Sequence, residues 1–350
     1  MNITDIDINE AEKTLLPKDM HFDDERRDFI KDLESCDLLA VPGSGKTTAL
    51  QAKLFCMARH LPLEKGQGIL VLSHTNNAVN EVKKKLYAEC NPLFEEPHFI
   101  GTVQDFVDKF LAIPFYEQFY KQKVHVIDGM AYEQEVERYL KTSIRKLSKG
   151  TLHLYKKGVN FTDIRIQRTK DGSLKYTRGM NDELSFKPVK KWIREGTEQQ
   201  KHEEIKADLK KMKQTIMKKG ILHYDDCYIL ADAYIRKYPF VKKTLRKRFK
   251  YVFIDETQDL KKYQLDLIDS IFDSDECCIQ RIGDKNQTIF NKPDRDIPDQ
   301  WNIRKVKYLQ NSLRLTESIA KVVNPFAVDN DAGNNSESMF TVNPHCSSLW

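Results

Sequence analysis

Asp37-Leu-Leu-Ala-Val-Pro-Gly-Ser-Gly-Lys-Thr47 is the stretch from which the architecture of this chain can be inferred. A short apolar run passes into a Pro-Gly-Ser-Gly turn, and apolar residues at helical spacing follow over Thr47–Arg59. The pattern predicts a strand, a loop and a helix in that order. Gly43 and Gly45 allow the loop to turn backbone N–H groups inward around an anion, and the helix adds its positive N-terminal end. We therefore predict a phosphate-binding loop.

The loop is expected to bind a nucleotide, with ATP and Mg²⁺ as the cofactors. Such loops have a Gly, four residues and then Gly-Lys-Ser/Thr, and here Ala40 takes the first position. Lys46 would bridge the β and γ phosphates, and Thr47 would hold Mg²⁺. An ordinary turn before a capped helix does not explain why strand, loop, Lys-Thr and helix coincide. The predicted nucleotide-binding residues are Ala40, Val41, Pro42, Gly43, Ser44, Gly45, Lys46, Thr47 and Thr48.

A second strand end carries two consecutive carboxylates, in Tyr251-Val-Phe-Ile-Asp-Glu-Thr-Gln-Asp259. A buried strand that ends in Asp-Glu places both side chains at the carboxyl edge of a parallel sheet, where ligands bind. Asp255 would hold the same Mg²⁺ as Thr47, and Glu256 would orient and deprotonate the attacking water. Taken alone, the segment is also compatible with a strand followed by an acidic turn. Together with the loop it predicts a nucleoside triphosphatase.

A third strand end, Cys278-Ile-Gln-Arg-Ile-Gly-Asp-Lys-Asn-Gln287, points to the same edge of the sheet. The neutral amide of Gln287 is suited to reading the γ-phosphate. By itself the segment is weak support, because Gly-Asp is also an ordinary turn.

Strands alternate with helices on both sides of a long interruption, which predicts a parallel α/β sheet. The expected strands are 37–41, 68–72, 99–102, 251–254 and 277–282, and the expected helices are 23–33, 47–59, 77–89, 104–111, 131–147, 198–217, 224–238, 263–272 and 316–323. The rhythm disappears between about Phe115 and Gly220, where a hairpin is expected around Thr169–Thr177. We interpret this segment as an inserted subdomain.

Charge is distributed unevenly along the chain. The formal net charge of the 350 residues is only +5, but residues 121–220 contain 25 Lys and Arg against 13 Asp and Glu. The other residues carry 32 against 39. A polyanion partner for the middle segment explains this asymmetry, although a solvated Lys-rich helical face is the usual meaning of such a run.

Composition excludes several classes of protein. Hydrophobic residues make up 40% of the chain, which rules out a disordered or low-complexity protein. No apolar run approaches the ~20 residues that span a bilayer, and the N-terminus is acidic where a secretory signal is basic. Seven scattered Cys residues without zinc spacing indicate reduced thiols. We expect a cytoplasmic protein with no membrane partner.

With these residues in view, the chain resembles the UvrD/Rep/PcrA branch of superfamily 1 DNA helicases over roughly residues 22–326. Several short motifs occur in the family's order, which is a specific signal. The similar segments are Ala40–Thr47 (motif I), Ser73–Glu81 (motif Ia), Gly101–Phe106 (motif Ib), His223–Asp226 (a short acidic motif), Asp255–Asp259 (motif II), Gly283–Phe290 (motif III) and Leu309–Ile319 (motif IV).

The resemblance implies a fold, domains and residue roles. The fold would be α/β, a RecA-like P-loop NTPase lobe with a parallel sheet, plus an inserted basic, mainly helical subdomain. The lobe would comprise 1–114 and 221–310, the subdomain 115–220, and the start of a second RecA-like lobe 311–350. Catalytic roles fall to Glu256, Gln287 and Arg314, and Mg²⁺ to Thr47 and Asp255. Single-stranded or partly duplex DNA would pass Thr75, Asn76, Thr102 and Phe106.

Some features depart from the family. The adenine-reading Gln upstream of the loop is not evident, and Phe22–Arg27 lies there instead. Leu313 stands where the family usually has Tyr, and motif III lacks its usual following Trp. Motifs V and VI have no counterpart, so we expect a missing C-terminal lobe or a protein partner to complete the ATP site.

Two classes of function remain open from the sequence. The first is an ATP-dependent DNA helicase or translocase, 3′→5′ by resemblance, in repair, replication or phage defence. With its second lobe incomplete, the chain would bind nucleotide but unwind weakly or not at all.

The second class of function is an ATP-gated DNA-binding or regulatory module that does not unwind, for example a helicase-like subunit of an anti-phage defence system. An RNA helicase of the Upf-like branch and a small-molecule kinase are minor readings, disfavoured by the segments at Asp255 and Gly283. The aromatic residues Phe106, Phe290 and Trp301 are suited either to base stacking or to the core.

Overall fold

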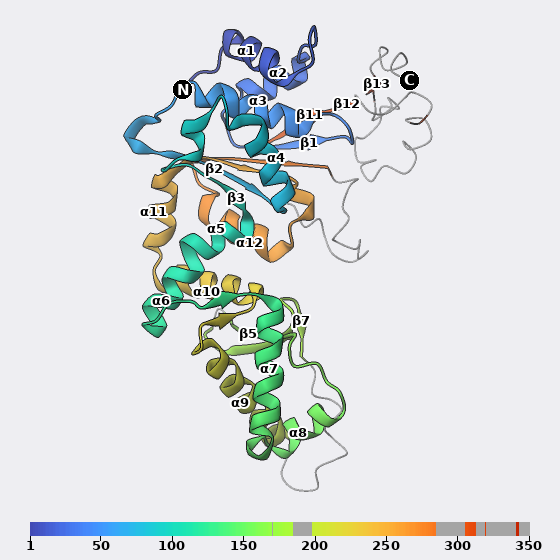
Figure 1. Cartoon of the computed structure of the whole chain (residues 1–350), viewed down its shortest axis with the longest axis vertical. Helices are drawn as coiled ribbons and strands as arrows, with labels where there is room; N and C mark the ends of the chain where they lie inside the picture. Colours follow the sequence, from blue (N-terminus) through green and yellow to red (C-terminus); the bar gives the residue numbers. More distant parts are fainter. Residues whose placement is uncertain (170, 185–197, 285–304, 313–318, 320–340, 343–350) are drawn as a thin grey trace. The chain divides into compact units, whose positions relative to one another are not determined.

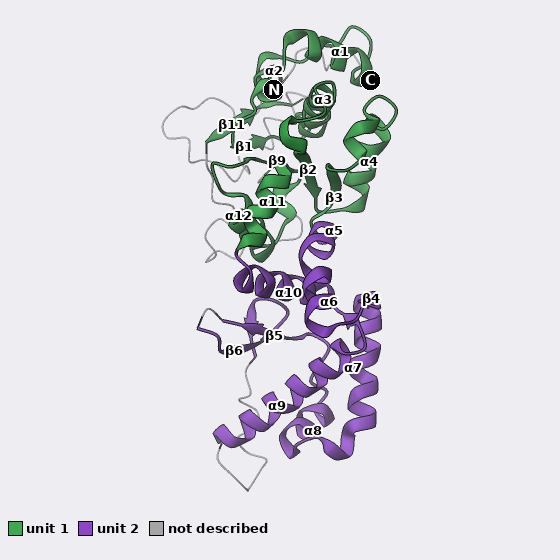
Figure 2. Ribbon diagram, turned by 90° about the vertical axis from the view of Figure 1, so that its left-hand side faces the viewer, with its two compact units in different colours: residues 1–103, 240–350 green, residues 104–239 purple. Residues whose placement is uncertain are grey.

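The computed structural model describes residues 1–169, 171–184, 198–284, 305–312, 319 and 341–342. The chain forms two compact units, which are described separately: unit 1 comprises residues 1–103 and 240–350, and unit 2 comprises residues 104–239 (Figure 2). The second unit is therefore longer at both ends than the segment 115–220 that the sequence marks by its charge. Helices and loops that surround this segment pack with it, and charge gives no sign of that.

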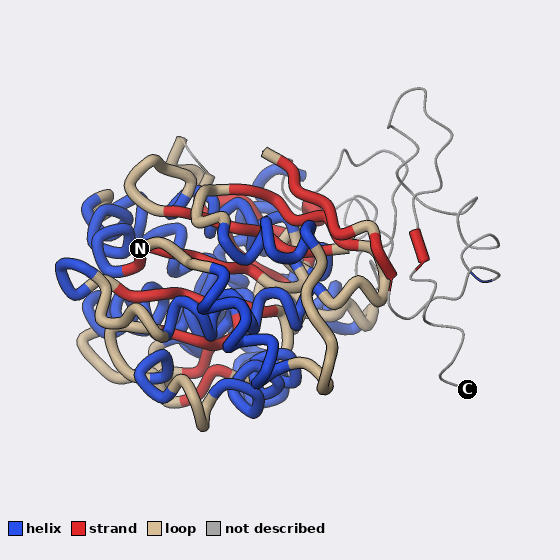
Figure 3. The backbone as a smooth tube through the Cα atoms, turned by 90° about the horizontal axis from the view of Figure 1, so that it is seen from above, coloured by secondary structure: helices blue, strands red, loops and turns tan. Residues whose placement is uncertain are grey.

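The described part of unit 1 is built on a parallel sheet of six strands in the order β11-β1-β10-β9-β2-β3. Five of them coincide closely with predicted strands, and β11, an edge strand of four residues, was not predicted. Figure 3 shows the strands in red and the helices in blue along the backbone. The strands are β1 (Cys36–Ala40), β2 (Gly68–Ser73), β3 (Phe99–Thr102), β9 (Phe249–Ile254), β10 (Cys278–Gly283) and β11 (Val306–Leu309).

Helices cover both faces of this sheet (Figure 1). Alternate strand residues such as Val71 and Phe253 pack in one core with residues of α1, α2 and α3, including Phe29 and Leu50. At the start of β9, Phe249 contacts Phe272 of α12 with ring centroids 6.4 Å apart, and the alternate residues Val252 and Ile254 are also fully buried. Burial on both faces explains why the central strands are almost continuously apolar. The helices are α1 (Asp5–Leu15), α2 (Asp24–Lys31), α3 (Lys46–Ala58), α4 (Asn76–Leu86), α11 (Phe240–Arg248) and α12 (Lys262–Phe272).

Short elements complete unit 1. They are the 3₁₀ turns η1 (Glu64–Gly66), η2 (Asn91–Phe94) and η6 (Thr257–Asp259) and the short strands β12 (Asn311–Ser312) and β13 (Thr341–Val342), which pair with each other. The predicted helix over 316–323 falls almost entirely outside the described residues.

A buried ion pair joins two neighbouring strands of the sheet. Arg281 of β10 donates from Nε and Nη2 to the two carboxylate oxygens of Asp37 in β1, at 2.7 and 2.8 Å. Both side chains are 1% exposed. A bidentate pair of this kind has a strict geometry, so it favours a single register between the strand before the phosphate loop and β10.

Unit 2 combines helices with a three-stranded antiparallel sheet, β5-β6-β7, in its described residues. The predicted hairpin is present as β5 and β6, and the predicted helix 198–217 is present with those bounds. The hydrophobic core of unit 2 is formed by α7, α8, α9 and the hairpin. The elements are α5 (Val103–Val107), η3 (Asp108–Ala112), α6 (Ile113–Tyr120), β4 (Val126–Ile127), α7 (Gly129–Ser143), η4 (Ile144–Lys146), α8 (Lys149–Lys156), β5 (Ile164–Arg168), β6 (Leu174–Arg178), β7 (Asp182–Glu183), α9 (Glu198–Met217), β8 (Ile221–Leu222) and α10 (Tyr224–Lys237).

Gly150 permits a close contact between α8 and α9. A Cβ atom at Gly150 would lie 2.9 Å from two carbon atoms of Ile205, so α8 and α9 approach more closely than a larger residue allows.

Two further predictions concern the environment of the chain. The six cysteines in the described residues are buried and unbonded, as expected for reduced thiols. Among the helices that the structure describes, none has the length and apolar character needed to cross a membrane.

Candidate active site

The predicted phosphate-binding loop follows β1 and leads directly into α3. Gly43 and Gly45 both have left-handed backbone conformations, with φ of 76° and 72°. A residue with a Cβ would be strained at either position, which explains the two glycines. Gly45 precedes the first turn of α3, so the positive end of the helix faces the loop. The expected strand, loop and helix are all present in this order.

Lys46 and Glu256 come together from two different strands of the sheet. Lys46 Nζ lies 2.9 Å from Glu256 Oε2, with side chains 11% and 28% exposed. Lys46 begins the helix after β1, and Glu256 follows β9; β10 separates these two strands. The parallel arrangement thus brings two segments that are far apart in sequence to one sheet edge.

Asp255 lies beside this ion pair at the end of β9 and is buried. Burial, and then the neighbouring Glu256 carboxylate, raise the pKa of Asp255 to about 7, against an ordinary value of 3.8, although the Lys46 charge acts in the opposite direction. The Glu256 N–H donates to Asp255 Oδ1 at 3.0 Å. A carboxylate held in this way gains from a cation, which is the property expected of a metal ligand.

Gln258 connects Glu256 with the third strand end. Its Nε2 donates to Glu256 Oε2 at 2.6 Å, and its Oε1 accepts from the Asp284 N–H at 3.0 Å. Glu256 itself has φ of 51°, a left-handed conformation that is uncommon outside glycine. Gln258 lies in the motif II segment, but no role was predicted for it. Its position two residues after Glu256 was the available signal.

Two residues without a predicted role, Arg26 and Ser312, bind backbone carbonyl oxygens of the loop. Arg26 of α2 donates from Nε and Nη2 to the Ser44 carbonyl oxygen, at 3.0 and 2.5 Å. Ser312 Oγ donates to the Pro42 carbonyl oxygen at 2.8 Å. No local pattern marks these contacts, because their partners lie 18 and 270 residues away in sequence.

Three of the four residues expected to contact DNA lie at the carboxyl ends of β2 and β3. Thr75 and Asn76 are exposed, and Thr75 caps α4 by accepting from the Ala78 N–H at 3.3 Å. Thr102 ends β3 beside Ser73 and is largely buried. Phe106 is fully buried and its ring centroid lies 5.4 Å from that of Phe110. The core interpretation therefore fits Phe106, and we do not propose that it stacks on a base.

Several predicted residues lie outside the described part of the chain. They are Gln287, Phe290, Trp301, Leu313 and Arg314, and their roles remain predictions.

The acidic motif His223–Asp226 lies in unit 2, where it begins α10. Asp226 caps the helix by accepting from the His223 N–H at 2.9 Å. Its side chain lies 2.5 Å from Lys213 Nζ, and Asp225 lies 2.9 Å from Arg165 Nε. Burial, and then the Arg165 charge, lower the pKa of His223. These contacts indicate a structural role.

The site's residues suit a nucleotide and a magnesium ion. The Ser44 hydroxyl is buried and has no hydrogen-bond partner within the described residues. Lys46 is a cation of the kind that binds phosphate oxygens, and Asp255 is a buried carboxylate next to a second one. Magnesium is usually held by one or two protein oxygens together with substrate phosphates. Thr47 and Asp255 are the residues that would hold it.

Comparisons with known proteins agree with this geometry. Residues 23–292 match the family model described as the UvrD/REP helicase N-terminal domain. A relative from Bacillus subtilis (strain 168), named "Putative ATP-dependent DNA helicase YjcD", is 24% identical over 270 residues. The match covers 72% of this chain and 30% of that protein, so the chain matches less than a third of its relative's length.

Proposed function

This chain belongs to the UvrD/Rep helicase family, and on that premise we propose that it is the ATP-hydrolysing part of a DNA helicase or translocase. It would bind Mg·ATP and single-stranded or partly duplex DNA. The 3′→5′ direction follows only from the family resemblance.

The observation that supports this proposal most strongly is the meeting of Lys46 and Glu256 at 2.9 Å, with buried Asp255 beside them. The three groups have complementary tasks. Lys46 would bind phosphate oxygens, and its ion pair with Glu256 would then break. Glu256 would be left to orient a water molecule and to accept its proton.

Thr47 and Asp255 would hold Mg²⁺, and Gln258 would keep Glu256 in place. Magnesium, when bound, offsets negative charge on the phosphate oxygens. Because burial disfavours ionised Asp255, a cation near it favours the ionised form and stabilises the site. The positive φ of Glu256 is consistent with strain kept at a functional position.

The DNA path would follow the carboxyl ends of β2 and β3. Thr75 and Asn76 expose polar groups there, which are suited to phosphate contacts without reading sequence. The basic middle segment would add salt-dependent affinity for the polynucleotide backbone. Phe106, being buried, has no part in this proposal.

Two substitutions test the proposal on the full chain. Lys46→Ala is expected to abolish binding of a fluorescent ATP analogue. Glu256→Gln is expected to retain binding within a few-fold while single-turnover hydrolysis falls by about 10²-fold or more. Asp266→Asn on α12 is the matched control, because its pairing with Lys262 lies in solvent, with side chains 59% and 55% exposed.

The same assay distinguishes the two classes of function. If single-stranded DNA stimulates turnover by the wild-type chain and Glu256→Gln removes that stimulation, the motor is supported. An effect of nucleotide on DNA affinity without any turnover would favour an ATP-gated binding module. Nucleotide binding that Lys46→Ala leaves intact would contradict the proposed site altogether.

A further inference from the structure

We propose that Arg26 is a positioning residue for nucleotide binding: it holds the phosphate-binding loop from behind and ties it to the Asn311–Ser312 segment. The inference rests on the proposed function, because it concerns how the same loop is kept ready for phosphate. It adds a residue and a connection that the family match does not assign.

Arg26 uses its guanidinium to contact two remote segments and the cap of its own helix. Its Nε and Nη2 donate to the Ser44 carbonyl oxygen, and Nη2 also donates to the Asn311 carbonyl oxygen at 2.9 Å. Its Nη1 pairs with Asp23, the residue that caps α2. The side chain is buried, so these hydrogen bonds are shielded from water. A planar group with five donors is suited to such a junction, whereas a lysine is not.

The contact with Ser44 fixes the direction of the next N–H group. The Ser44 carbonyl and the Gly45 N–H belong to one peptide, and in a trans peptide they point in opposite directions. Because Arg26 holds the oxygen on its own side, the Gly45 N–H is directed to the other side of the loop. The guanidinium lies close to Gly45, where a Cβ would be 3.9 Å from Arg26 Nε.

A second contact acts on the loop in the same way. Ser312 Oγ donates to the Pro42 carbonyl oxygen at 2.8 Å, and this oxygen shares a peptide with the Gly43 N–H. The Val41 N–H donates to the Leu309 carbonyl oxygen at 3.0 Å. The segment 309–312 therefore contacts the loop directly at two points and through Arg26 at a third. A shift of the loop on phosphate binding is expected to reach this segment.

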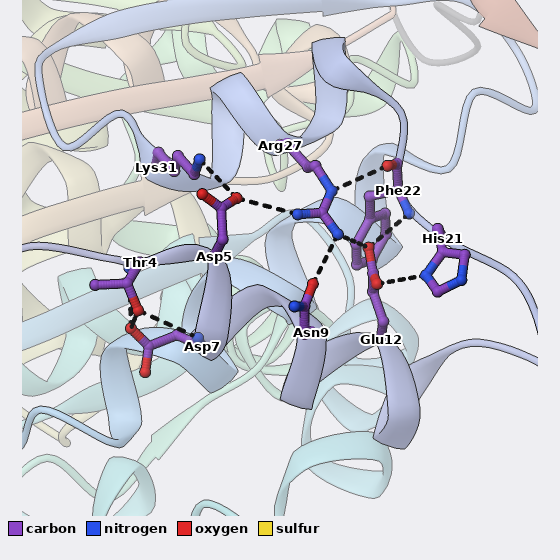
Figure 4. Close-up of polar contacts among 9 residues, drawn as sticks. All are labelled: Thr4, Asp5, Asp7, Asn9, Glu12, His21, Phe22, Arg27 and Lys31. Atoms are coloured by element: carbon purple, nitrogen blue, oxygen red, sulfur yellow. Dashed lines mark hydrogen bonds and ion pairs between the residues drawn. The ribbon is translucent and has the colours of Figure 1, made fainter.

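The neighbouring Arg27 offers a matched control on the same helix. Figure 4 shows it directed towards α1, with no residue of the phosphate loop among its partners there. It pairs with Asp5 at 3.1 Å and with Glu12 at 2.7 Å. The two consecutive arginines thus have different partners. Arg26 contacts the loop, and Arg27 contacts α1 and stabilises its packing on α2.

The first test measures nucleotide affinity with a fluorescent ADP or ATP analogue, well below the unfolding temperature of every variant. Arg26→Ala is expected to weaken binding by about tenfold or more, since hydrogen bonds from a charged donor are lost. Arg26→Lys is expected to recover only part of this loss. Ser312→Ala, which leaves the guanidinium in place, is expected to cost about two- to threefold.

Arg27→Ala is expected to change affinity by less than about twofold, although it lowers the melting temperature by a few degrees. Equal losses of affinity in Arg26→Ala and Arg27→Ala would overturn the inference, because a general loss of α2 packing would then explain both. Unchanged affinity in Arg26→Ala would overturn it as well.

The second test measures hydrogen exchange of the backbone amides with and without nucleotide. If Arg26 only stabilised α2, its loss would not selectively remove the effect of nucleotide on residues 309–312. In the wild type, nucleotide is expected to slow exchange in both 41–45 and 309–312. In Arg26→Ala the response of 309–312 should be lost, and in Arg27→Ala it should persist. If the wild type binds no nucleotide, the proposed function fails. Exchange in the free protein then still tests whether Arg26 holds the loop and the segment 309–312. Faster exchange of both segments in Arg26→Ala supports its contacts, and unchanged exchange overturns them.

Discussion

Each unit of this molecule contains two adjacent acidic residues, Asp225 and Asp226 in unit 2 and Asp255 and Glu256 in unit 1. The two pairs differ in how their negative charge is balanced by nearby cations. In unit 2, Asp225 lies 2.9 Å from Arg165, and Asp226 lies 2.5 Å from Lys213. Each carboxylate has its own cation, and the pairs connect α10 with β5 and α9. Burial alone would lower the pKa of Lys213, but the Asp226 carboxylate and the Tyr132 side chain together offset burial, so that pKa is raised.

In unit 1, Asp255 and Glu256 share Lys46, which lies next to Glu256. Burial and the Glu256 charge then raise the pKa of Asp255 to about 7. The comparison shows how similar sequences acquire different tasks. Matched charges stabilise a fold, whereas an excess of negative charge lowers the stability of the free protein and favours a ligand that brings positive charge.

The largest stability effect is expected from Asp226→Asn. It leaves the buried Lys213 without its carboxylate, so unit 2 should lose roughly 3–5 kcal/mol of its free energy of unfolding. Hydrogen exchange of α9 and α10 measures the loss within that unit. Exchange that stays at the wild-type rate would contradict the structural role assigned to this pair.

Asp255→Asn should act in the opposite direction in protein kept free of Mg²⁺ with EDTA. Since the ionised form is disfavoured by burial, we expect up to roughly 4 kcal/mol of added stability at pH 8. The same variant should lose the Mg²⁺ dependence of nucleotide binding. Exchange of α3 and β9 reports the first effect and titration with a fluorescent nucleotide the second. Destabilisation as large as that of Asp226→Asn would remove the distinction between the two pairs.

The pH dependence of that gain is a separate prediction. The pKa of Asp255 in the folded chain lies above its ordinary value of 3.8, so the folded chain binds this proton more tightly. The resulting stability is fully present below about pH 4 and is lost as the pH rises towards 7. The difference between Asp255→Asn and wild type should therefore be small at pH 4 and maximal above pH 7. Denaturant unfolding of both proteins over this range measures it, and a constant difference would contradict the shift.

The smallest effect is expected from Asp225→Asn. Its side chain is 15% exposed, and water compensates part of the lost interaction with Arg165. We expect a loss of roughly 1–2 kcal/mol in unit 2. Exchange of β5 and α10 measures it, with Asp226→Asn as reference. An effect larger than that of Asp226→Asn would show that Arg165, not Lys213, is the dominant cation.

Much of the site followed from local sequence because its parts sit at strand ends. The strand before Pro42, the glycines of the loop and the Asp-Glu pair each have a short-range pattern. Since carboxyl ends of parallel strands share one edge, the proximity of Lys46 and Glu256 could also be expected. In unit 2 the helix 198–217 and the hairpin were predictable for similar local reasons.

Other features had no local pattern. The edge strand β11 has only four residues, and its pairing with β1 makes it a strand. Phe106 lies in a motif-like segment, but its exposure depends on which elements pack over it. The ends of unit 2 depend on contacts of the flanking helices and not on the charge of the middle segment.

The sequence by itself determined the phosphate loop, the acidic strand end and the alternation that makes a parallel sheet, because each depends on residues close together in the chain. Only the tertiary structure decided how the charges are shared. It gave Asp226 its own lysine, left Asp255 with a raised pKa, and placed Arg26 rather than Arg27 behind the loop. The reason is physical: electrostatic and hydrogen-bond energies depend on distance and burial, and residues remote in sequence set both.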